Sequence, residues 1–347
     1  MVGSNQNASK DGFAIYSRRY IGSKARLVEW IYKEVSERAQ GSSFFDVFAG
    51  TGVVSSRFLE SQKRLVLNDF LHSNNVIYKA FLQSNDVDLL RIAQLASEIE
   101  ARAARSKSVN YFSENFGGKF FSIADARKIG FIRQRISKMA QEGAIDESEF
   151  NVLLASLILS ADRSANTVGH YDAYRRRSAI EETFHFRLVN PLNTRGKTIE
   201  IYREDSNALA PRVTADIAFI DPPYNSRQYS RFYHVLENLA EWKKPTLYGT
   251  ALKPKPENMS DYCRVSAPES FASLIRNLHC RYLVVTYNNT FRPKSSSSRN
   301  KIPLEFIENC MNDVGPTTML NTNHRHFNSG KTEFDNHREY LFITKVR

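Results

Sequence analysis

Short apolar runs alternate with longer amphipathic stretches in the first 85 residues and again after residue 195. Short apolar runs are typical of buried strands, and apolar residues three or four positions apart are typical of helices. We expect strands at 44–48, 64–68, 198–202, 215–220 and 281–286, and helices at 23–38, 53–60, 71–84, 232–242, 268–279 and 302–313. This alternation predicts an α/β fold with a mostly parallel sheet.

Residues 86–195 interrupt the alternation with a mainly helical pattern. Helices are expected near 87–105 and 123–141, and an apolar helix at 148–163 would supply this segment with a core of its own. A strand is expected at 183–189.

We therefore predict three parts. Residues 1–85 and 196–347 are expected to be the two parts of one catalytic domain, and residues 86–195 an inserted subdomain. Two closing strands, near 317–323 and 338–346 with a turn at 327–330 between them, predict an antiparallel hairpin at the sheet edge.

The tetrapeptide Asp221-Pro222-Pro223-Tyr224 directly follows the apolar run at 217–220. At the end of a buried strand it would present a carboxylate, free carbonyl groups and an aromatic ring. An aryl amine such as N6 of adenine is a poor nucleophile, and Asp221 and the Pro222 carbonyl could accept its hydrogen bonds. A base stacked on Tyr224 would contribute roughly 1–3 kcal/mol. The plain alternative is a strand followed by a proline turn.

A second candidate site lies upstream, in Asp46-Val47-Phe48-Ala49-Gly50-Thr51-Gly52. Gly50 and Gly52 permit positive φ and close approach of a ligand to the backbone. Asp69 ends the next strand, where an acid can accept hydrogen bonds from ribose hydroxyls. Alone, the glycine turn is equally typical of dinucleotide-binding proteins or of simple packing, but Ser55 replaces the third glycine of the dinucleotide fingerprint and disfavours a pyrophosphate.

Charge narrows the class of partner. The 347 residues carry a net charge of +11, which favours a polyanion such as nucleic acid. Arg175, Arg176 and Arg177 form a basic run inside the interrupting segment. The first residues are polar, no apolar run is long enough to span a membrane, and three widely spaced cysteines indicate reduced thiols, so we expect a cytoplasmic protein without a metal site.

The order of these motifs resembles that of the D12 class of N6-adenine-specific DNA methyltransferases. The resemblance rests on the glycine turn, on the later tetrapeptide at 221–224, and on Tyr20-Ile21-Gly22-Ser23-Lys24 near the amino terminus. Three further stretches, at 165–174, 225–229 and 285–289, are similar to the same class. The resemblance implies a Rossmann-like class I methyltransferase sheet and assigns DNA target recognition to residues 86–195.

The resemblance also implies S-adenosylmethionine as cofactor. The residues it assigns to the cofactor are Tyr20, Lys24, Asp46, Phe48, Gly50, Gly52, Asp69 and Asp205. Within this set, Asp46 would face the methionine ammonium, Asp69 the ribose and Asp205 the adenine amino group. Two alternatives stay open: Asp205 could only cap a helix, and Lys24 could contact DNA phosphate or be an ordinary surface lysine.

Double-stranded DNA is the implied partner, with Arg175, Arg176, Arg177, Arg227 and Asn288 as candidate contacts. The expected reaction is methyl transfer to N6 of a flipped-out adenine, with a restriction endonuclease as a possible companion and no obligate protein partner. The alternatives are methylation of RNA adenine or of the cytosine amine, and a catalytically silent module that binds DNA or cofactor. Aspartate at position 221 favours adenine over cytosine.

Overall fold

The computed structural model describes residues 12–176, 179–289, 300–323 and 338–347. The chain divides into two compact units, which are described separately. Unit 1 comprises Met1–Tyr20, His72–Arg195 and Tyr233–Lys255, and unit 2 comprises Ile21–Leu71, Gly196–Phe232 and Pro256–Arg347. The predicted turn at 327–330 and Arg177 lie outside the described residues.

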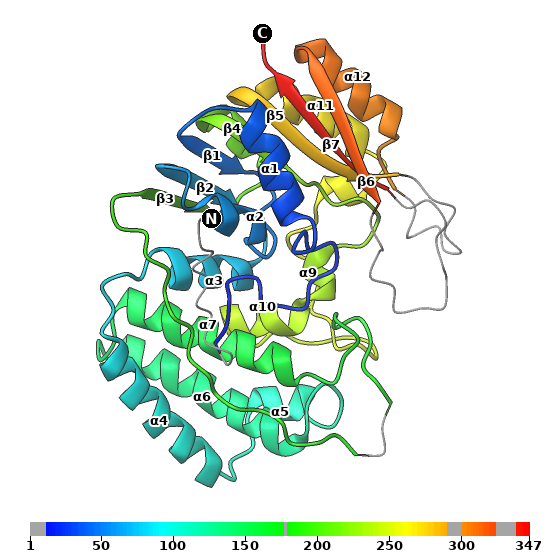
Figure 1. The fold of residues 1–347 in the computed structure, drawn as a ribbon. Coiled ribbons are helices and arrows are strands. Elements are labelled where there is room, and N and C mark those ends of the chain that lie inside the picture. The colour runs from blue at the N-terminus through cyan, green and yellow to red at the C-terminus, as the bar shows by residue number, and fades with distance from the viewer. Residues whose placement is uncertain (1–11, 177–178, 290–299, 324–337) are drawn as a thin grey trace. The chain divides into compact units, whose positions relative to one another are not determined.

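Unit 2 contains a seven-stranded sheet (Figure 1). Its strands are β1 (Ser43–Asp46), β2 (Arg64–Asn68), β3 (Thr198–Tyr202), β4 (Thr214–Ile220), β5 (His279–Asn288), β6 (Thr317–Asn323) and β7 (Arg338–Lys345). The spatial order of the described strands is β3-β2-β1-β4-β5-β7-β6, in which β7 runs opposite to the other six strands. The prediction of a mostly parallel sheet with an antiparallel edge is confirmed.

Alternating side chains of the central strands form the cores on the two faces of the sheet. On one face, Phe44 of β1 stacks on Phe58 of α2 (Val53–Phe58) with ring centroids 4.3 Å apart, and α1 (Val28–Arg38) packs against α2. On the other face, Phe45 belongs to a buried cluster with side chains of α11 (Ala267–Asn277) and α12 (Leu304–Val314). Figure 1 shows these two helix pairs with the sheet between them.

Unit 1 is helical in its described residues. Its helices are α3 (His72–Leu82), α4 (Leu89–Arg105), α5 (Tyr111–Phe116), α6 (Ile123–Gln141), α7 (Glu147–Ser164) and α10 (His234–Glu241). The central helix α7 is buried on almost all sides and packs against α3 and α6. The carboxylate of Asp146 caps its first turn by accepting from the Glu149 backbone N–H at 2.8 Å.

The strand predicted at 183–189 is wrong. This segment is irregular, and its backbone N–H groups donate to side chains of neighbouring helices instead of to a strand. Phe186 donates to Glu100 of α4 at 3.0 Å, and Val189 donates to Ser156 of α7, also at 3.0 Å. These acceptors satisfy much of the extended backbone, and the only β contact in the described part of this segment is an isolated parallel bridge between Val189 and Phe13.

Several boundaries also differ from the predictions. The first helix begins at Val28 and not near residue 23, and the helix expected at 232–242 is divided into α9 (Tyr229–Phe232) in unit 2 and α10 in unit 1. Short elements in unit 2 are α8 (Ser206–Leu209), η1 (Ala210–Arg212) and η2 (Asp261–Cys263).

Candidate active site

The candidate site lies where parallel strands of unit 2 end. Asp46 ends β1, Asp69 follows β2, Asp221 follows β4 and Asn288 ends β5. Because β1, β2, β4 and β5 are parallel, their carboxyl ends lie along one edge of the sheet. Ligands of open α/β sheets bind at this edge.

Three side chains donate to the same carboxylate oxygen of Asp221. Lys24 Nζ lies 2.8 Å from Asp221 Oδ1, the Tyr224 hydroxyl donates to it at 2.7 Å, and Thr286 Oγ1 donates at 3.0 Å. Lys24 also donates to the Tyr224 hydroxyl at 2.9 Å. In the described contacts all three donors meet Oδ1, so the carboxylate is held in one orientation.

The charges around this network keep both donors protonated. Burial lowers the pKa of Lys24, but the carboxylates of Asp221 and Glu339 outweigh it and raise that pKa above 10.5. Burial, together with the charges of Asp221 and Glu339, raises the pKa of Tyr224 well above its usual value. At neutral pH Lys24 is therefore an ammonium and Tyr224 a phenol, and both can donate to Asp221.

The location of Lys24 settles one of its alternatives. Its side chain is only 5% exposed and precedes α1, so it is not a surface lysine of that helix. Its ammonium lies 4.8 Å from the centroid of the Tyr224 ring, which in turn packs on Tyr287 at 4.5 Å. Lys24 thus pairs with Asp221 and Tyr224 of the tetrapeptide, and its role at the cofactor or at DNA phosphate stays a prediction.

The glycine turn after β1 is fixed by Asp69. Gly50 and Gly52 have φ values of 55° and 74°, in the region that side chains disfavour. The Gly50 N–H donates to Asp69 Oδ2 at 3.0 Å, and the Leu71 N–H donates to Oδ1 at 2.8 Å. Asp69 thus joins the glycine turn to the end of β2.

Asp46 is a buried carboxylate with an incomplete set of donors. Ser55 of α2 donates to Oδ2 at 2.7 Å, whereas Oδ1 is buried without a hydrogen-bond partner in the described part of the chain. Burial, together with the nearby carboxylates of Asp221 and Asp69, raises the pKa of Asp46 to about 7, against the lowering effect of the hydrogen bond from Ser55. A ligand ammonium fits this position, because it would supply the missing donor and balance the charge.

The other predicted cofactor residues have different surroundings. Phe48 packs edge-on against Tyr262, with ring centroids 4.9 Å apart. Asp205 is exposed and caps α8, accepting from the backbone N–H groups of Asn207 and Ala208 at 3.0 and 3.1 Å. Asp205 therefore caps a helix, as one of the two interpretations expected, and the role of Asp205 at a cofactor stays a prediction.

The predicted DNA contacts are divided between the units. Arg227 and Asn288 lie in unit 2, where Asn288 is buried and its side-chain oxygen accepts from Asn300 at 2.8 Å. Arg175 and Arg176 lie in unit 1 and are exposed. Tyr20 also falls in unit 1, where its ring stacks on that of Tyr233 at 4.9 Å.

Three functional candidates were missing from the sequence-based set. Thr286 and Ser55 are the hydroxyl donors to Asp221 and Asp46, and Glu339 of β7 is a buried acid whose charge acts on Lys24. Thr286 stands two residues before Asn288 on β5, so the strand register could have indicated it. Glu339 gave no such signal, because its place follows from the pairing of β7 with β5.

The strand order, with its single antiparallel strand, and the glycine turn after β1 define a class I methyltransferase fold. A sequence profile of the D12 class N6 adenine-specific DNA methyltransferase family matches residues 20–294. The chain therefore belongs to this family, whose members use S-adenosylmethionine and methylate adenine in DNA.

Individual relatives agree with this assignment. The chain is 29% identical over 341 residues to Type II methyltransferase M.NlaIII of Neisseria lactamica, covering 93% of this chain and 98% of that protein. It is 29% identical over 337 residues to Type II methyltransferase M.CviAII of Paramecium bursaria Chlorella virus 1, covering 94% and 98%. Its similarity to Type II methyltransferase M.FokI of Planomicrobium okeanokoites, 30% over 294 residues, covers 78% of this chain but 44% of that protein.

Proposed function

We propose that Asp221 is the residue that receives the target amine when this methyltransferase modifies N6 of adenine in duplex DNA. The observation that supports this proposal most strongly is that three side chains donate to Asp221 Oδ1. With that oxygen engaged, the other carboxylate oxygen is oriented to accept a hydrogen bond from N6. The carboxylate would stabilise positive charge that develops on the attacking nitrogen.

Catalysis by this chain is then mainly positioning. S-adenosylmethionine, when bound, supplies a methyl group already activated on a sulfonium. The protein has to hold N6 in line with that group, and alignment of this kind lowers a barrier by several kcal/mol, up to about 7–11 kcal/mol in well-oriented cases. Pro222 and Pro223 would fix the turn, and Tyr224 would offer its ring to the flipped base.

The cofactor residues are proposed on the fit of the glycine turn. Asp46 would accept from the methionine ammonium, and Gly50 and Gly52 would let the backbone approach the cofactor. Asp69 would accept from the ribose hydroxyls. Phe48 and Tyr20 would add apolar contacts, and Asp205 would meet the adenine amino group.

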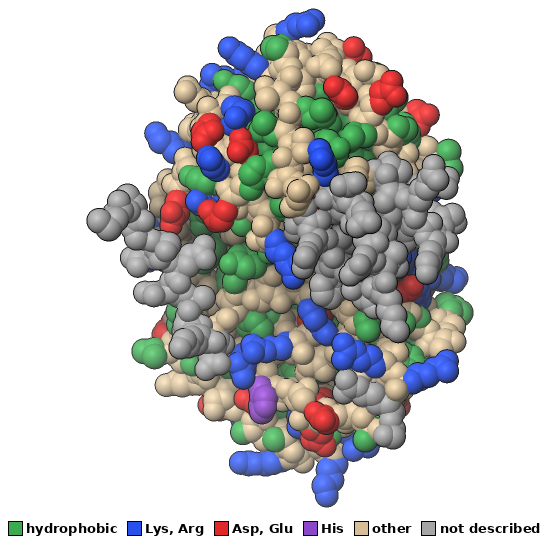
Figure 2. Space-filling view, turned by 45° about the vertical axis from the view of Figure 1, so that its right-hand side comes forward, with side chains coloured by type: hydrophobic (Ala, Val, Ile, Leu, Met, Phe, Trp, Pro, Cys, Tyr) green, Lys and Arg blue, Asp and Glu red, His purple; other side chains and the backbone are tan. Residues whose placement is uncertain are grey.

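DNA would be held by basic and polar side chains. We propose Arg175, Arg176 and Arg177 as contacts from residues 86–195 and Arg227 and Asn288 as contacts from the catalytic part. Figure 2 shows that many Lys and Arg side chains are exposed at the surface, and such side chains attract phosphate groups. Residues 86–195 would select the DNA sequence.

The biological setting is proposed from the relatives. Several are named Type II methyltransferases or modification methylases, which supports a restriction-modification system with a cognate endonuclease. Within the described residues, no helix has the length and apolar character to cross a membrane. We propose a cytoplasmic location, where the protein would meet its DNA.

The test is transfer of a labelled methyl group from S-adenosylmethionine to duplex DNA of mixed sequence. We expect transfer by the wild type and none by Asp221→Ala, while Asp216→Asn, at the opposite end of β4, keeps most of it. Sequencing that detects modified bases should report N6-methyladenine. Transfer only to RNA or to cytosine would support an alternative substrate, and a folded protein that binds cofactor without any transfer would contradict the proposal.

A further inference from the structure

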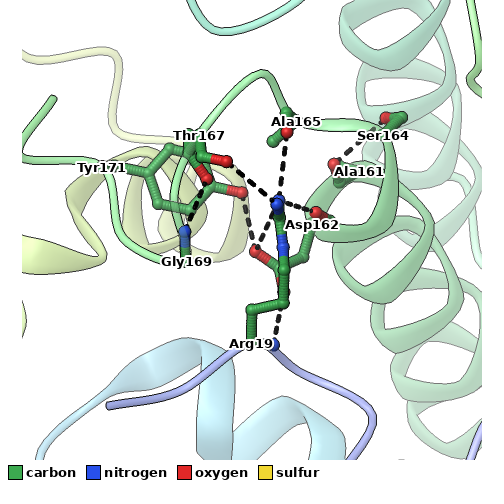
Figure 3. A network of polar contacts seen from close by, with 8 residues as sticks. All are labelled: Arg19, Ala161, Asp162, Ser164, Ala165, Thr167, Gly169 and Tyr171. Atoms are coloured by element: carbon green, nitrogen blue, oxygen red, sulfur yellow. Dashed lines mark hydrogen bonds and ion pairs between the residues drawn. The ribbon is translucent and has the colours of Figure 1, made fainter. Parts of the chain in front are cut away.

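Arg19 of unit 1 lies at the carboxyl end of α7 and donates to the segment that follows this helix (Figure 3). Its guanidinium donates to the carbonyl oxygens of Asp162, Ala165 and Thr167, the last two at 3.2 and 3.4 Å. The last carbonyl groups of a helix have no partner within the helix, and a cation there also interacts favourably with the helix dipole. Arg19 therefore both ends α7 and fixes the start of the next segment.

Asp162 connects the two sides of this arrangement. Its carboxylate, 4% exposed, accepts from the Arg19 backbone N–H at 2.9 Å and from the Tyr171 hydroxyl at 2.9 Å. The Tyr171 ring is fully buried. Figure 3 shows Arg19 and Tyr171 approaching Asp162 from different directions. One buried acid thus joins Arg19 to Tyr171, a residue of the segment that follows α7.

Residues 166–175, which we call the 166–175 loop, are closed at their base as well. Asn166 accepts from the Arg175 N–H at 3.2 Å and donates through its side chain to the Arg175 carbonyl at 2.8 Å. Lys253 forms an ion pair with Asp172. The loop is therefore tied down on several sides, whereas Arg175 at its end and Arg176 directly after it are exposed.

We propose that Arg19 is a positioning residue for DNA binding: it holds the 166–175 loop in the conformation in which Arg175 and Arg176 meet the phosphates. This inference rests on the proposed function of those arginines. A loop that is ordered before binding loses less conformational freedom when the complex forms, and so it binds more tightly. Arg19 donates to three backbone carbonyl groups, whereas its guanidinium lies 3.8 Å from the Asp162 carboxylate, so we expect its planar fork of donors to matter more than its charge.

Arg19→Lys is the main test, because it keeps the charge and removes the fork. We expect amide hydrogen exchange in the 166–175 loop of the DNA-free protein to accelerate by about 10-fold, and the KM for mixed-sequence duplex DNA to rise by about 10-fold. The kcat at saturating DNA and the Kd for S-adenosylmethionine should stay within about 2-fold. A residue needed only for folding would not separate KM from kcat in this way.

The matched control is Arg91→Lys. Arg91 also joins a carboxylate, that of Glu149, and a carbonyl oxygen, that of Ala144, but it does so at the opposite end of α7. It should leave both loop exchange and the KM for DNA unchanged. Tyr171→Phe removes only the hydroxyl donor to Asp162 and should move both quantities in the same direction as Arg19→Lys, by about 2- to 3-fold.

Several outcomes overturn the inference. Unchanged loop exchange in Arg19→Lys would show that Arg19 does not hold the loop, and faster exchange with an unchanged KM would show that the loop conformation does not matter for DNA. A KM that rises in Arg19→Met but not in Arg19→Lys would mean that Arg19 acts through its charge. If the wild type transfers no methyl group to DNA, the proposed function fails, and the exchange measurement still decides whether Arg19 holds the loop.

Discussion

Two carboxylates at the same edge of the sheet in unit 2 have opposite surroundings. Asp221, after β4, receives three protein donors on one oxygen. Asp46, at the end of β1, receives one donor from Ser55, and its second oxygen is buried without a partner in the described residues. An acid whose donors all come from the protein is oriented before any ligand arrives. An acid that lacks a donor needs a proton or a ligand to complete it.

The largest effect is expected from replacing Asp221 by Asn. The amide keeps the size of the side chain but removes the negative charge that would stabilise the reacting amine, so kcat should fall by about 1,000-fold. The Kd for S-adenosylmethionine should change by less than about 2-fold if Asp46 and Asp221 serve different ligands. Single-turnover methyl transfer and cofactor titration measure the two quantities. Equal losses in kcat and in affinity for S-adenosylmethionine would contradict the idea that Asp46 and Asp221 serve different ligands.

Lys24→Met tests whether the donors of Asp221 are required. The variant leaves a mostly buried carboxylate without its cation, which costs up to about 3–5 kcal/mol in stability. We expect kcat to fall by about 100-fold because Asp221 is no longer held. Denaturant unfolding and methyl transfer together measure the effects, and Lys24→Arg, which keeps the charge, is the comparison. A fully active Lys24→Met would show that the network is not needed.

The ion pair between Lys24 and Asp221 should stabilise the folded protein only up to an alkaline pH. The folded protein raises the pKa of Lys24 above 10.5, so the ammonium stabilises the native state below that pH and the contribution is lost as the pH rises through the folded pKa. The stability difference between the wild type and Lys24→Met should therefore be constant from neutral pH to about pH 10.

Asp46 should make cofactor binding depend on pH. Its pKa of about 7 means that the free protein holds a proton there below neutral pH. An ammonium ligand favours the ionised acid, so the Kd for S-adenosylmethionine should fall by up to about 10-fold per pH unit as the pH rises towards 7, and then level off. Isothermal titration at several pH values measures this.

Asp46→Asn is the control for that pH dependence. The amide cannot ionise, so the variant should bind more weakly by about 10-fold at pH 8, with a Kd that no longer changes between pH 5.5 and 7 on this account. The folded protein also binds the Asp46 proton more tightly than the unfolded chain, so the stability of the wild type relative to Asp46→Asn should fall as the pH rises from about 4 to 7. An identical pH profile in both proteins would place the titrating group elsewhere.

The surroundings of Asp46 and Asp221 also show which parts of the site could be predicted from the sequence. Asp221 was found because it directly follows a short apolar run, which is a local signal, whereas Asp46 was assigned because the glycine turn resembles that of a known family. Thr286 and Ser55 were not found, because their importance depends on which strand and helix lie next to each acid. Glu339 was even harder to predict from local sequence, because its position depends on the antiparallel pairing of β7 with β5.

The errors have a similar cause. The segment at 183–189 has the apolar alternation of a strand, but side chains of Glu100 and Ser156 satisfy its backbone. A strand requires a neighbouring strand, which local sequence does not specify. By contrast, α6 and β2 occupy the predicted residues 123–141 and 64–68, because their patterns and caps lie within the segments themselves.

The smallest effect is expected for Thr286, whose hydroxyl is one of three donors to Asp221. Thr286→Val has nearly the same shape and removes one hydrogen bond, which is worth about 0.5–1.5 kcal/mol. We expect kcat to fall by about 2- to 10-fold with little change in KM for DNA or cofactor. Thr286→Ser keeps the hydroxyl and should retain most of the activity. If both variants lose activity equally, packing on β5 matters and not the donor; if neither does, Lys24 and Tyr224 alone orient Asp221.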